Sequence, residues 1–304
     1  MILSTLDKSR KGGAYEQIPS LVLGQRWTPQ LNSRNMMKVV LCVWIEPYIE
    51  NDLSFCVWPV HTPTTSKEVL TLSESTSPLP YTGNKSCIVN TILSVMPKHT
   101  VYIDPCMGSA EVFFRKPRAE KEILNDYNGD LVNLFRVIQN NEKLAYLLGR
   151  LYLSINGELA FKQNKDRLKG VPNILDDVIE TSQIFYDASW EDIQNAAAFL
   201  ENQVYSFSST GQTFGIARRD MSQRLPRLMS AYNRIRDAII LHRDYKDVIT
   251  YAACPGSFIL LDPPYKGTED MYSKANFDIE QHDILFSFMS EVNQQHHGEV
   301  KFLI

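Results

Sequence analysis

The chain has 304 residues, of which 44% are hydrophobic and 22% are charged, and its formal net charge is −4. This composition excludes a wholly disordered chain, a collagen and a small disulfide-rich protein. The acidic balance also disfavours a protein that coats nucleic acid by bulk charge, although it is compatible with a local basic face. The length suffices for one large domain or two small ones.

The cysteines and histidines show no pattern of a metal or redox site. The five cysteines are scattered, and the six histidines form no HxH or HxxxH pair. We therefore expect free thiols, no bound metal and a cytoplasmic location. The longest early apolar run, at residues 39–45, is too short to cross a bilayer, so we expect neither a membrane span nor a signal peptide.

Residues 1–78 differ from the rest of the chain. Two short β-like runs, at residues 38–45 and 53–60, are followed by a Ser/Thr-rich stretch that ends at Pro78. We expect an irregular N-terminal extension of unknown role. One hypothesis is that the two runs form a hairpin that replaces a missing edge of a sheet.

From Tyr81 onward, helical and strand patterns alternate. The apolar spacing predicts helices at 84–96, 110–115, 131–138 and 278–292, and strands at 101–104, 122–125, 257–262 and 300–304. Strand–helix–strand–helix order is typical of a doubly wound parallel sheet. We therefore predict an α/β fold, with ligands bound beyond the carboxyl ends of the strands.

Two of these strands end in an acidic residue. Asp104 is followed by a turn that contains Gly108, where the backbone can approach a ligand closely. Asp126 ends the next strand and suits hydrogen bonds to the hydroxyls of a ribose. The glycine turn is a weak signal alone, because a simple tight turn usually explains such a sequence. A helix N-cap explains Asp126 as well as ribose binding does.

The third strand end is the most specific signal. Asp262-Pro263-Pro264-Tyr265 follows a buried strand directly. The two prolines fix the backbone and remove two N–H donors, so the preceding carbonyl is free to face a cleft. An acceptor carboxylate, an acceptor carbonyl and an aromatic ring are together what holding a planar amine requires.

These motifs resemble the Dam-like (D12 class) adenine-specific DNA methyltransferase family over about residues 79–304. Asp-Pro-Pro-Tyr is similar to the catalytic signature of amino-methyltransferases that use S-adenosylmethionine. Tyr81-Thr-Gly-Asn-Lys85 resembles the family's opening Trp-Ala-Gly-Gly-Lys. The stretches at 102–114 and 123–131 resemble its cofactor turn and its ribose-binding segment. The chain departs from the family at Tyr81, which replaces Trp, and at Ala110, which replaces a glycine.

The resemblance implies a Rossmann-like methyltransferase sheet, S-adenosylmethionine as cofactor and double-stranded DNA as partner, in a monomer. It implies direct methyl transfer to the exocyclic amine of a flipped-out adenine. The catalytic residues would be Asp262, Pro263, Pro264 and Tyr265. The cofactor would be bound by Tyr81, Lys85, Asp104, Gly108, Asp126 and Asp262.

About 158 residues separate Asp104 from Asp262, which is more than a compact sheet needs between these strands. The resemblance implies a mainly helical target-recognition insert, which we place at residues 141–245 between the catalytic segments 79–140 and 246–304. Between residues 218 and 243 there are seven arginines and two aspartates. The apolar residues from Leu225 to Ile239 form one stripe at helical spacing, so we expect the arginines to face outward and to contact phosphate. The alternative is a solvated amphipathic helix. Our candidates for DNA contact are Gln212, Thr213, Arg218, Arg219, Arg224 and Arg227.

The family's sheet has seven strands, and this chain reaches about the fifth. We therefore expect the C-terminal strands to be missing. One alternative is a truncated, inactive remnant that binds DNA or cofactor without turnover. Another is an RNA or N4-cytosine methyltransferase with the same amine chemistry. The biological context expected for such a protein is restriction–modification or a prophage.

Overall fold

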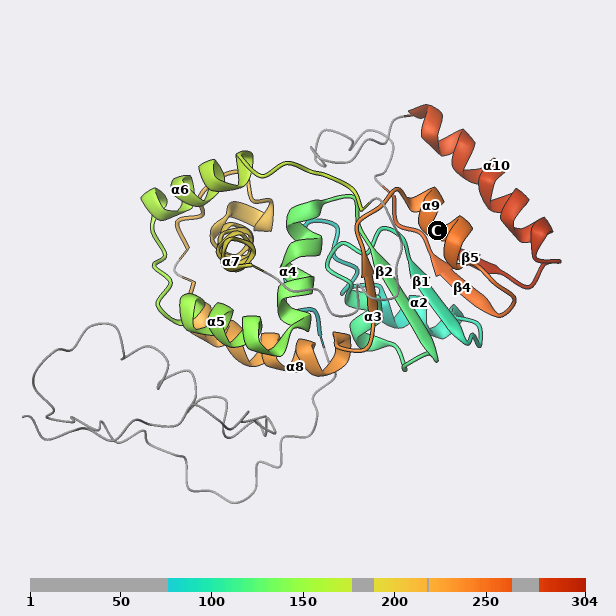
Figure 1. Ribbon diagram of the computed structural model, residues 1–304, viewed down its shortest axis with the longest axis horizontal. Helices are drawn as coiled ribbons and strands as arrows, with labels where there is room; N and C mark the ends of the chain where they lie inside the picture. The colour runs from blue at the N-terminus through green and yellow to red at the C-terminus, as the bar shows by residue number, and fades with distance from the viewer. Residues whose placement is uncertain (1–75, 177–188, 218, 264–278) are drawn as a thin grey trace, which may run out of the picture.

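The computed structural model describes residues 76–176, 189–217, 219–263 and 279–304. A five-stranded sheet with the strand order β3-β2-β1-β4-β5 lies at its centre, and every pairing is parallel (Figure 1). The predicted α/β class and parallel sheet are confirmed. The strands are β1 (Val101–Asp104), β2 (Lys121–Asn125), β3 (Ile239–Leu241), β4 (Ser257–Leu260) and β5 (Lys301–Leu303).

The strand order reverses between β1 and β4. The strands β2 and β3 lie on one side of β1, whereas β4 and β5 lie on the other. The connections that leave the carboxyl ends of β1 and β4 therefore diverge, and such a point is where doubly wound sheets bind their ligands.

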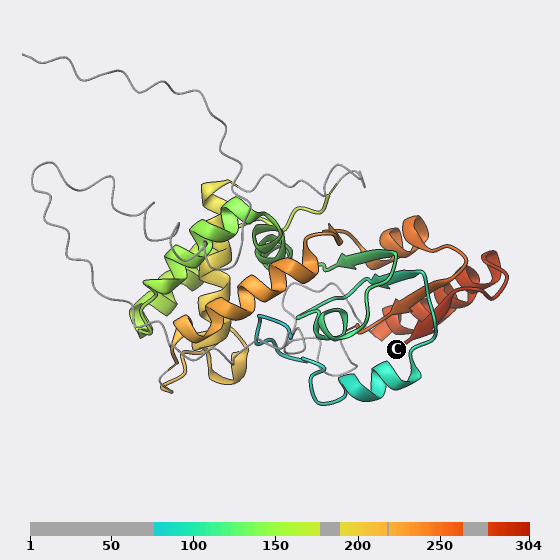
Figure 2. The same ribbon diagram turned by 90° about the horizontal axis from the view of Figure 1, so that it is seen from below.

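Both faces of the sheet are buried under helices (Figure 2). Successive side chains of a strand point to opposite faces, so neighbouring residues join different cores. Tyr102, Leu124 and Phe258 pack on one face with α2 (Val89–Val95), α3 (Glu111–Arg115) and α4 (Gly129–Gln139). Ile103 and Ile123 pack on the other face with α9 (Tyr245–Ala252) and α10 (Ile279–Gln295). Burial on both faces explains why adjacent residues of these strands, and not only alternate ones, are apolar.

The described helices divide between the sheet and a helical lobe. In Figure 1 the helices α5, α6 and α7 lie on the side of α4 that faces away from the sheet. They share one hydrophobic core with α4 and with the strands. The helices are α2 (Val89–Val95), α3 (Glu111–Arg115), α4 (Gly129–Gln139), α5 (Asn141–Tyr152), α6 (Glu158–Lys169), α7 (Trp190–Tyr205), α8 (Leu225–Ile235), α9 (Tyr245–Ala252) and α10 (Ile279–Gln295).

Side-chain caps fix where several helices begin. The side chain of Asn128 accepts from the backbone N–H of Asp130 at the start of α4, and Asn140 does the same for two N–H groups of α5. Ser189 and Asp192 form a reciprocal capping box at the start of α7. Each cap satisfies N–H groups that have no partner within the helix, which stabilises the helix by about 1 kcal/mol.

Residues 225–241 form a helix and a strand rather than one helix. The apolar stripe predicted as one helix ends with α8 at Ile235, and Ile239 instead begins β3. Because β3 pairs with β2, residues 239–241 belong to the sheet although we had placed them within the insert. A three-residue turn separates the two elements, and the β-branched pair Ile239 and Ile240 favours the strand.

A buried ion cluster ties α8 to the sheet. Glu122 of β2 accepts from Lys116 at 2.5 Å and from Arg234 of α8 at 2.5 and 2.8 Å. The guanidinium of Arg234 also lies 3.8 Å over the ring of Phe113. The prediction that all the arginines of this segment face outward is therefore wrong for Arg234, because a buried carboxylate holds its charge inside.

The N-terminal extension and its hairpin hypothesis lie outside the described residues, apart from residues 76–78. Among the helices that the structure describes, none combines the length and apolar character needed to cross a membrane.

Candidate functional site

A cleft of about 650 Å³ opens at the carboxyl end of the sheet, at the switch point between β1 and β4. It is lined by the turns that follow β1, β2 and β4, by the loop before α2 and by parts of the helical lobe. Seven of the residues predicted from the sequence line it together, namely Tyr81, Lys85, Asp104, Gly108, Asp126, Gln212 and Asp262.

The turn after β1 uses left-handed backbone at two positions. Gly108 has φ +48° and lies beside the ring of Tyr81, and Ala110 has φ +55° although it carries a side chain. The N–H of Ala110 donates to the carbonyl of Met107 at 2.6 Å, which closes the turn tightly. Left-handed backbone costs an alanine roughly 1–2 kcal/mol, so this turn stores strain next to the cleft.

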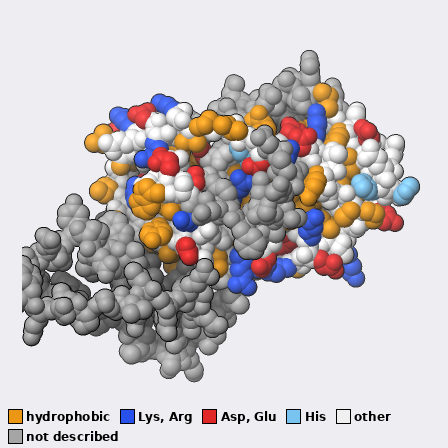
Figure 3. Space-filling view, in the orientation of Figure 1, with side chains coloured by type: hydrophobic (Ala, Val, Ile, Leu, Met, Phe, Trp, Pro, Cys, Tyr) orange, Lys and Arg blue, Asp and Glu red, His pale blue; other side chains and the backbone are white. Residues whose placement is uncertain are grey.

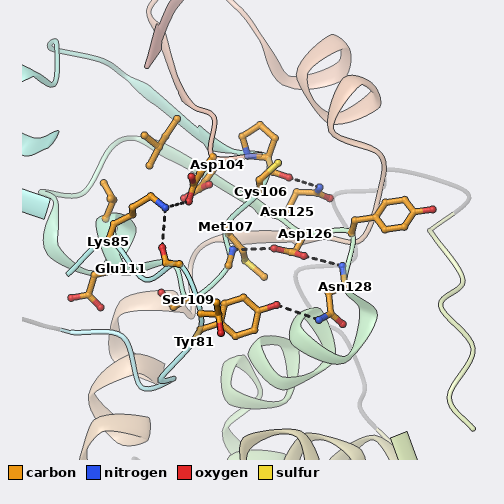
Figure 4. A pocket seen from close by; sticks show the side chains of 18 of the residues that line it. Tyr81, Lys85, Asp104, Cys106, Met107, Ser109, Glu111, Asn125, Asp126 and Asn128 are labelled. Carbon is orange, nitrogen blue, oxygen red and sulfur yellow. Dashed lines mark hydrogen bonds and ion pairs between the residues drawn. The ribbon is translucent and has the colours of Figure 1, made fainter. Parts of the chain in front are cut away.

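Asp126 joins the turns after β1 and β2. Its carboxylate accepts from the N–H of Gly108 at 2.9 Å and from the N–H of Asn128 at 2.8 Å (Figure 4). Asn128 donates in turn to the hydroxyl of Tyr81 at 3.4 Å. Burial raises the pKa of Asp126 to about 6, although these backbone hydrogen bonds oppose the rise.

Asp104 is a buried carboxyl group at the base of the cleft, with 3% of its surface exposed. Its Oδ2 accepts from the hydroxyl of Tyr102 at 2.9 Å. Within the part of the chain that the structure describes, no well-aligned donor reaches its Oδ1. Burial and the nearby charges of Asp262 and Asp126 raise the pKa of Asp104 to about 7, although the hydrogen bond from Tyr102 opposes the rise.

Asp262 follows β4 and enters the same cleft. Its carboxylate forms an ion pair with the ammonium of Lys85, which also donates to the carbonyl of Gly83 at 2.9 Å. Pro263 is buried directly after it. Pro264 and Tyr265 lie outside the described residues.

Two asparagines that the sequence analysis did not select hold this arrangement together. Asn125 donates to the carbonyls of Pro105 and Arg243, at 2.9 Å each, and accepts from the N–H of Arg243. It thereby links the ends of β1, β2 and β3. Asn128 supports both Asp126 and Tyr81. The signal was available, because Asn125-Asp126-Tyr-Asn128 concentrates short polar side chains that bond to the backbone directly after a strand.

Residues 205–215, an aromatic and Gly-rich loop at the end of α7, form a tight hairpin over one rim of the cleft. Phe207 donates to the carbonyl of Thr213, and Ser206 pairs with Phe214 in an antiparallel bridge. Gln212 lines the cleft, and its carbonyl accepts from Lys165 at 2.7 Å. Thr213 is not among the residues that line the cleft.

Three of the predicted DNA-contact arginines lie elsewhere. Arg219, Arg224 and Arg227 line a separate open hollow of about 1160 Å³ between the α5–α6 turn and the start of α8. Burial and the like charges of Arg227 and Arg219 lower the pKa of Arg224. Arg218 lies outside the described residues. The arginines therefore form a cluster of their own, away from the carboxylates of the cleft.

Two further features bear on the chemistry of the described residues. Among the described residues, no group of three His, Cys, Asp or Glu side chains is placed to hold a metal ion. Cys106 lines the cleft, but burial and the nearby Asp126 and Asp104 raise the pKa of its thiol. The thiol form is a poor nucleophile, so the cysteine does not have the properties of an activated one.

The sheet is doubly wound, with a glycine turn after β1 and carboxylates at or after the ends of β1, β2 and β4. In α/β proteins of this class, nucleotide-like ligands bind at the switch point. This arrangement is consistent with a Rossmann-like methyltransferase fold. The family comparison narrows the class further. The chain belongs to the D12 class of N6 adenine-specific DNA methyltransferases, whose family model matches residues 81–304.

Curated relatives of this chain include two modification methylases and a type II methyltransferase. The modification methylase LlaI of Lactococcus lactis subsp. lactis is 21% identical over 240 residues, which cover 73% of this chain and 36% of that protein. The modification methylase StsI of Streptococcus sanguinis is 25% identical over 240 residues, which cover 73% and 34%. The type II methyltransferase M1.LlaDCHI of Lactococcus lactis subsp. cremoris is 23% identical over 192 residues, which cover 61% and 64%. The matched part of this chain thus spans about a third of the first two relatives.

Proposed function

We propose that this protein transfers a methyl group from S-adenosylmethionine to the N6 amine of adenine in double-stranded DNA. The observation that carries the proposal is the meeting of Asp126 and Asp262 in one cleft. One carboxylate follows β2, where a ribose is held in such folds, and the other follows β4 beside it. The family match and the modification-enzyme relatives support the same reaction.

The residues of the cleft fit S-adenosylmethionine. The buried Oδ1 of Asp104 offers an acceptor for an ammonium group, and Asp126 offers acceptors for the ribose hydroxyls. The ring of Tyr81 gives the cleft an aromatic wall, and Lys85 supplies a cation that suits a carboxylate. When bound, the cofactor supplies an electrophilic methyl group on a sulfonium.

The target amine is a poor nucleophile, because its lone pair is delocalised into the purine ring. We propose that Asp262 and the carbonyl of Pro263 accept hydrogen bonds from the two N–H groups of this amine. Two such acceptors favour a pyramidal nitrogen whose lone pair points at the methyl group. Positioning and electrostatics then supply most of the catalysis. The transfer would leave a neutral thioether and a cationic methylated amine, which then loses a proton to solvent.

The base must leave the helix to reach Asp262, because duplex DNA does not fit into a cleft at the end of a sheet. We propose Tyr265 as the ring on which the flipped adenine stacks, with Pro264 fixing the backbone between them.

We propose that DNA is contacted by a mainly helical insert between α4 and β3. The candidates are Gln212 and Thr213 of the hairpin and the arginines at 218, 219, 224 and 227. The surface in Figure 3 carries acidic and basic side chains interspersed, so a local arginine cluster rather than bulk charge would bind phosphate. We further propose that the protein acts as a monomer on cytoplasmic DNA, in restriction–modification or a prophage.

The test is transfer of radiolabelled methyl from S-adenosylmethionine to unmethylated duplex DNA, followed by nucleoside analysis. The wild type is compared with Asp262→Ala. N6-methyladenine from the wild type alone supports the proposal. Label in RNA or in N4-methylcytosine would show that the substrate is RNA or cytosine rather than adenine in DNA, with the same amine chemistry. Saturable cofactor binding without any transfer would instead favour a protein that binds cofactor without turnover.

A further inference from the structure

A short segment of the helical lobe lies against the end of β3. Residues 171–176 follow α6, and the N–H of Asp176 donates to the carbonyl of His242 at 2.8 Å. His242 donates back to the carboxylate of Asp176 at 2.9 Å, and Arg136 of α4 pairs with the same carboxylate at 2.7 Å. These contacts fix the segment beside the turn that follows β2.

Asn173 in this segment forms hydrogen bonds to two backbone groups of the turn that follows β2. Its Nδ2 donates to the carbonyl of Tyr127 at 2.9 Å, and its Oδ1 accepts from the N–H of Gly129 at 2.8 Å. The Nε2 of His242 lies 3.2 Å from the same carbonyl of Tyr127 and donates to it. A Cβ on Gly129 would lie 2.8 Å from the Oδ1 of Asn173, so a glycine at this position leaves space for the side chain of Asn173.

The turn that Asn173 holds in this way contains Asp126. On its inner side, Asp126 is held by the N–H groups of Gly108 and Asn128. On its outer side, the backbone on both flanks of Asn128 is held by Asn173. The direction of the Asp126 carboxylate is therefore set jointly by the turn after β1 and by a residue of the lobe, far along the chain from either strand.

We propose that Asn173 is a positioning residue for cofactor binding, acting through the turn of Asp126. The inference rests on the proposed function, in which Asp126 binds the ribose hydroxyls. Asn173 itself does not contact the cofactor. It holds the peptides on either side of Asn128 so that the carboxylate of Asp126 faces the cleft.

The sharpest variant is Asn173→Asp, which keeps the shape of the side chain. The carboxylate still accepts from Gly129, but its second oxygen faces the carbonyl of Tyr127 and repels it. Replacing a hydrogen bond by repulsion is expected to weaken binding of S-adenosylhomocysteine about tenfold. The readout is the dissociation constant from isothermal titration calorimetry, measured below the melting temperature of each variant.

A second ligand distinguishes a positioning role of Asn173 from a non-specific disturbance of the cleft. The 2′-deoxy analogue of S-adenosylhomocysteine lacks one of the hydroxyls that Asp126 would bind. If Asn173 acts through Asp126, the wild type prefers the complete ligand and Asn173→Asp loses most of that preference. Equal weakening of both ligands would overturn the inference, and so would unchanged binding of both.

The control is Asn140→Asp, which makes the same charge change at the N-cap of α5, where Asp is an equally good cap. We expect both dissociation constants to stay within twofold of the wild type. If Asn173→Asp does not fold, Asn173→Ala removes both hydrogen bonds without repulsion and is measured in the same way. A wild type that binds neither ligand would refute the proposed function itself, and the inference with it.

Discussion

The ammonium of Lys85 and the carboxylate of Asp262 form an ion pair across the cleft, with side chains 18% and 28% exposed. Lys85 comes from the loop before α2, whereas Asp262 follows β4. In the reaction that we propose, this same carboxylate must accept from the target amine. Lys85 thus occupies a place that the substrate needs, and it must change partner when the cofactor and DNA bind.

This relationship predicts opposite effects of Lys85→Gln on the two ligands. Cofactor binding weakens because a cation is lost, whereas cofactor-free binding of duplex that contains the target adenine strengthens about fivefold because Asp262 is released. Fluorescence anisotropy with labelled duplex and calorimetry with cofactor measure the two changes. Lys169→Gln, which alters a more exposed lysine of the same cleft, serves as the control. Weakening of both ligands would contradict the exchange of partners.

Asp104 makes the stability of the free protein depend on pH. Its pKa rises from 3.8 to about 7 on burial, so the folded state binds this proton more tightly than the unfolded state does. The free-energy cost of burying the charged form of Asp104 in the folded protein therefore grows as pH rises from about 4 to 7. Asp104→Asn is expected to raise the free energy of unfolding by roughly 2–4 kcal/mol at pH 8 and by much less at pH 4.

Urea denaturation of both proteins between pH 4 and pH 8 measures this difference, and a gain that does not change with pH would contradict it. The same variant is expected to bind S-adenosylmethionine less tightly, because it loses the anionic acceptor for an ammonium. Higher stability with weaker binding is the usual relationship at a site that buries an uncompensated charge.

The buried cluster of Glu122, Lys116 and Arg234 predicts a large loss of stability on Glu122→Gln. Burial would raise the pKa of Glu122, but hydrogen bonds from Arg234 and Lys116 outweigh it and lower the pKa. Removing the carboxylate leaves two cations without their buried partner, which costs about 3–5 kcal/mol. Denaturant titration measures the loss. Asp237→Asn removes the exposed partner of Arg118 and is expected to cost less than about 1 kcal/mol.

The arginine cluster predicts a change in salt dependence rather than in sequence preference. If Arg224 and Arg227 each contact one phosphate, replacing both by Gln reduces the slope of log affinity against log salt by about 2. Binding to target and non-target duplexes then weakens equally. Anisotropy titrations between 50 and 300 mM salt measure the slope. Arg118→Gln is the control, and an unchanged slope in the double variant would place the DNA elsewhere.

Sequence patterns predicted the sheet well because its strands are buried on both faces. The runs at 101–104, 122–125 and 257–262 are short and contain adjacent apolar residues, which favours buried strands, and the structure has strands in all three places. The pattern failed at β3. There the strand has three residues and is separated from an amphipathic helix by a turn of three residues, so a period of 3.6 continued by chance through Ile239.

Much of the site was predictable for a similar reason. Parallel strands deliver their carboxyl ends to one edge, so acids at 104, 126 and 262 had to meet once the strands were identified. The supporting residues were not predictable in this way. Asn128 and Asn173 act through backbone groups, and Asn173 reaches the turn from a segment whose position depends on tertiary packing.

The hydrophobic core described above runs without a break from the sheet through α4 into the helical lobe. Phe135 and Leu131 of α4 are fully buried within it, as are Ala196 and Leu200 of α7. The lobe is therefore not a detachable module. Replacing it wholesale with the lobe of another methyltransferase would strip α4 of its packing, so redesign of DNA preference has to be confined to the hairpin and the arginine-bearing turn.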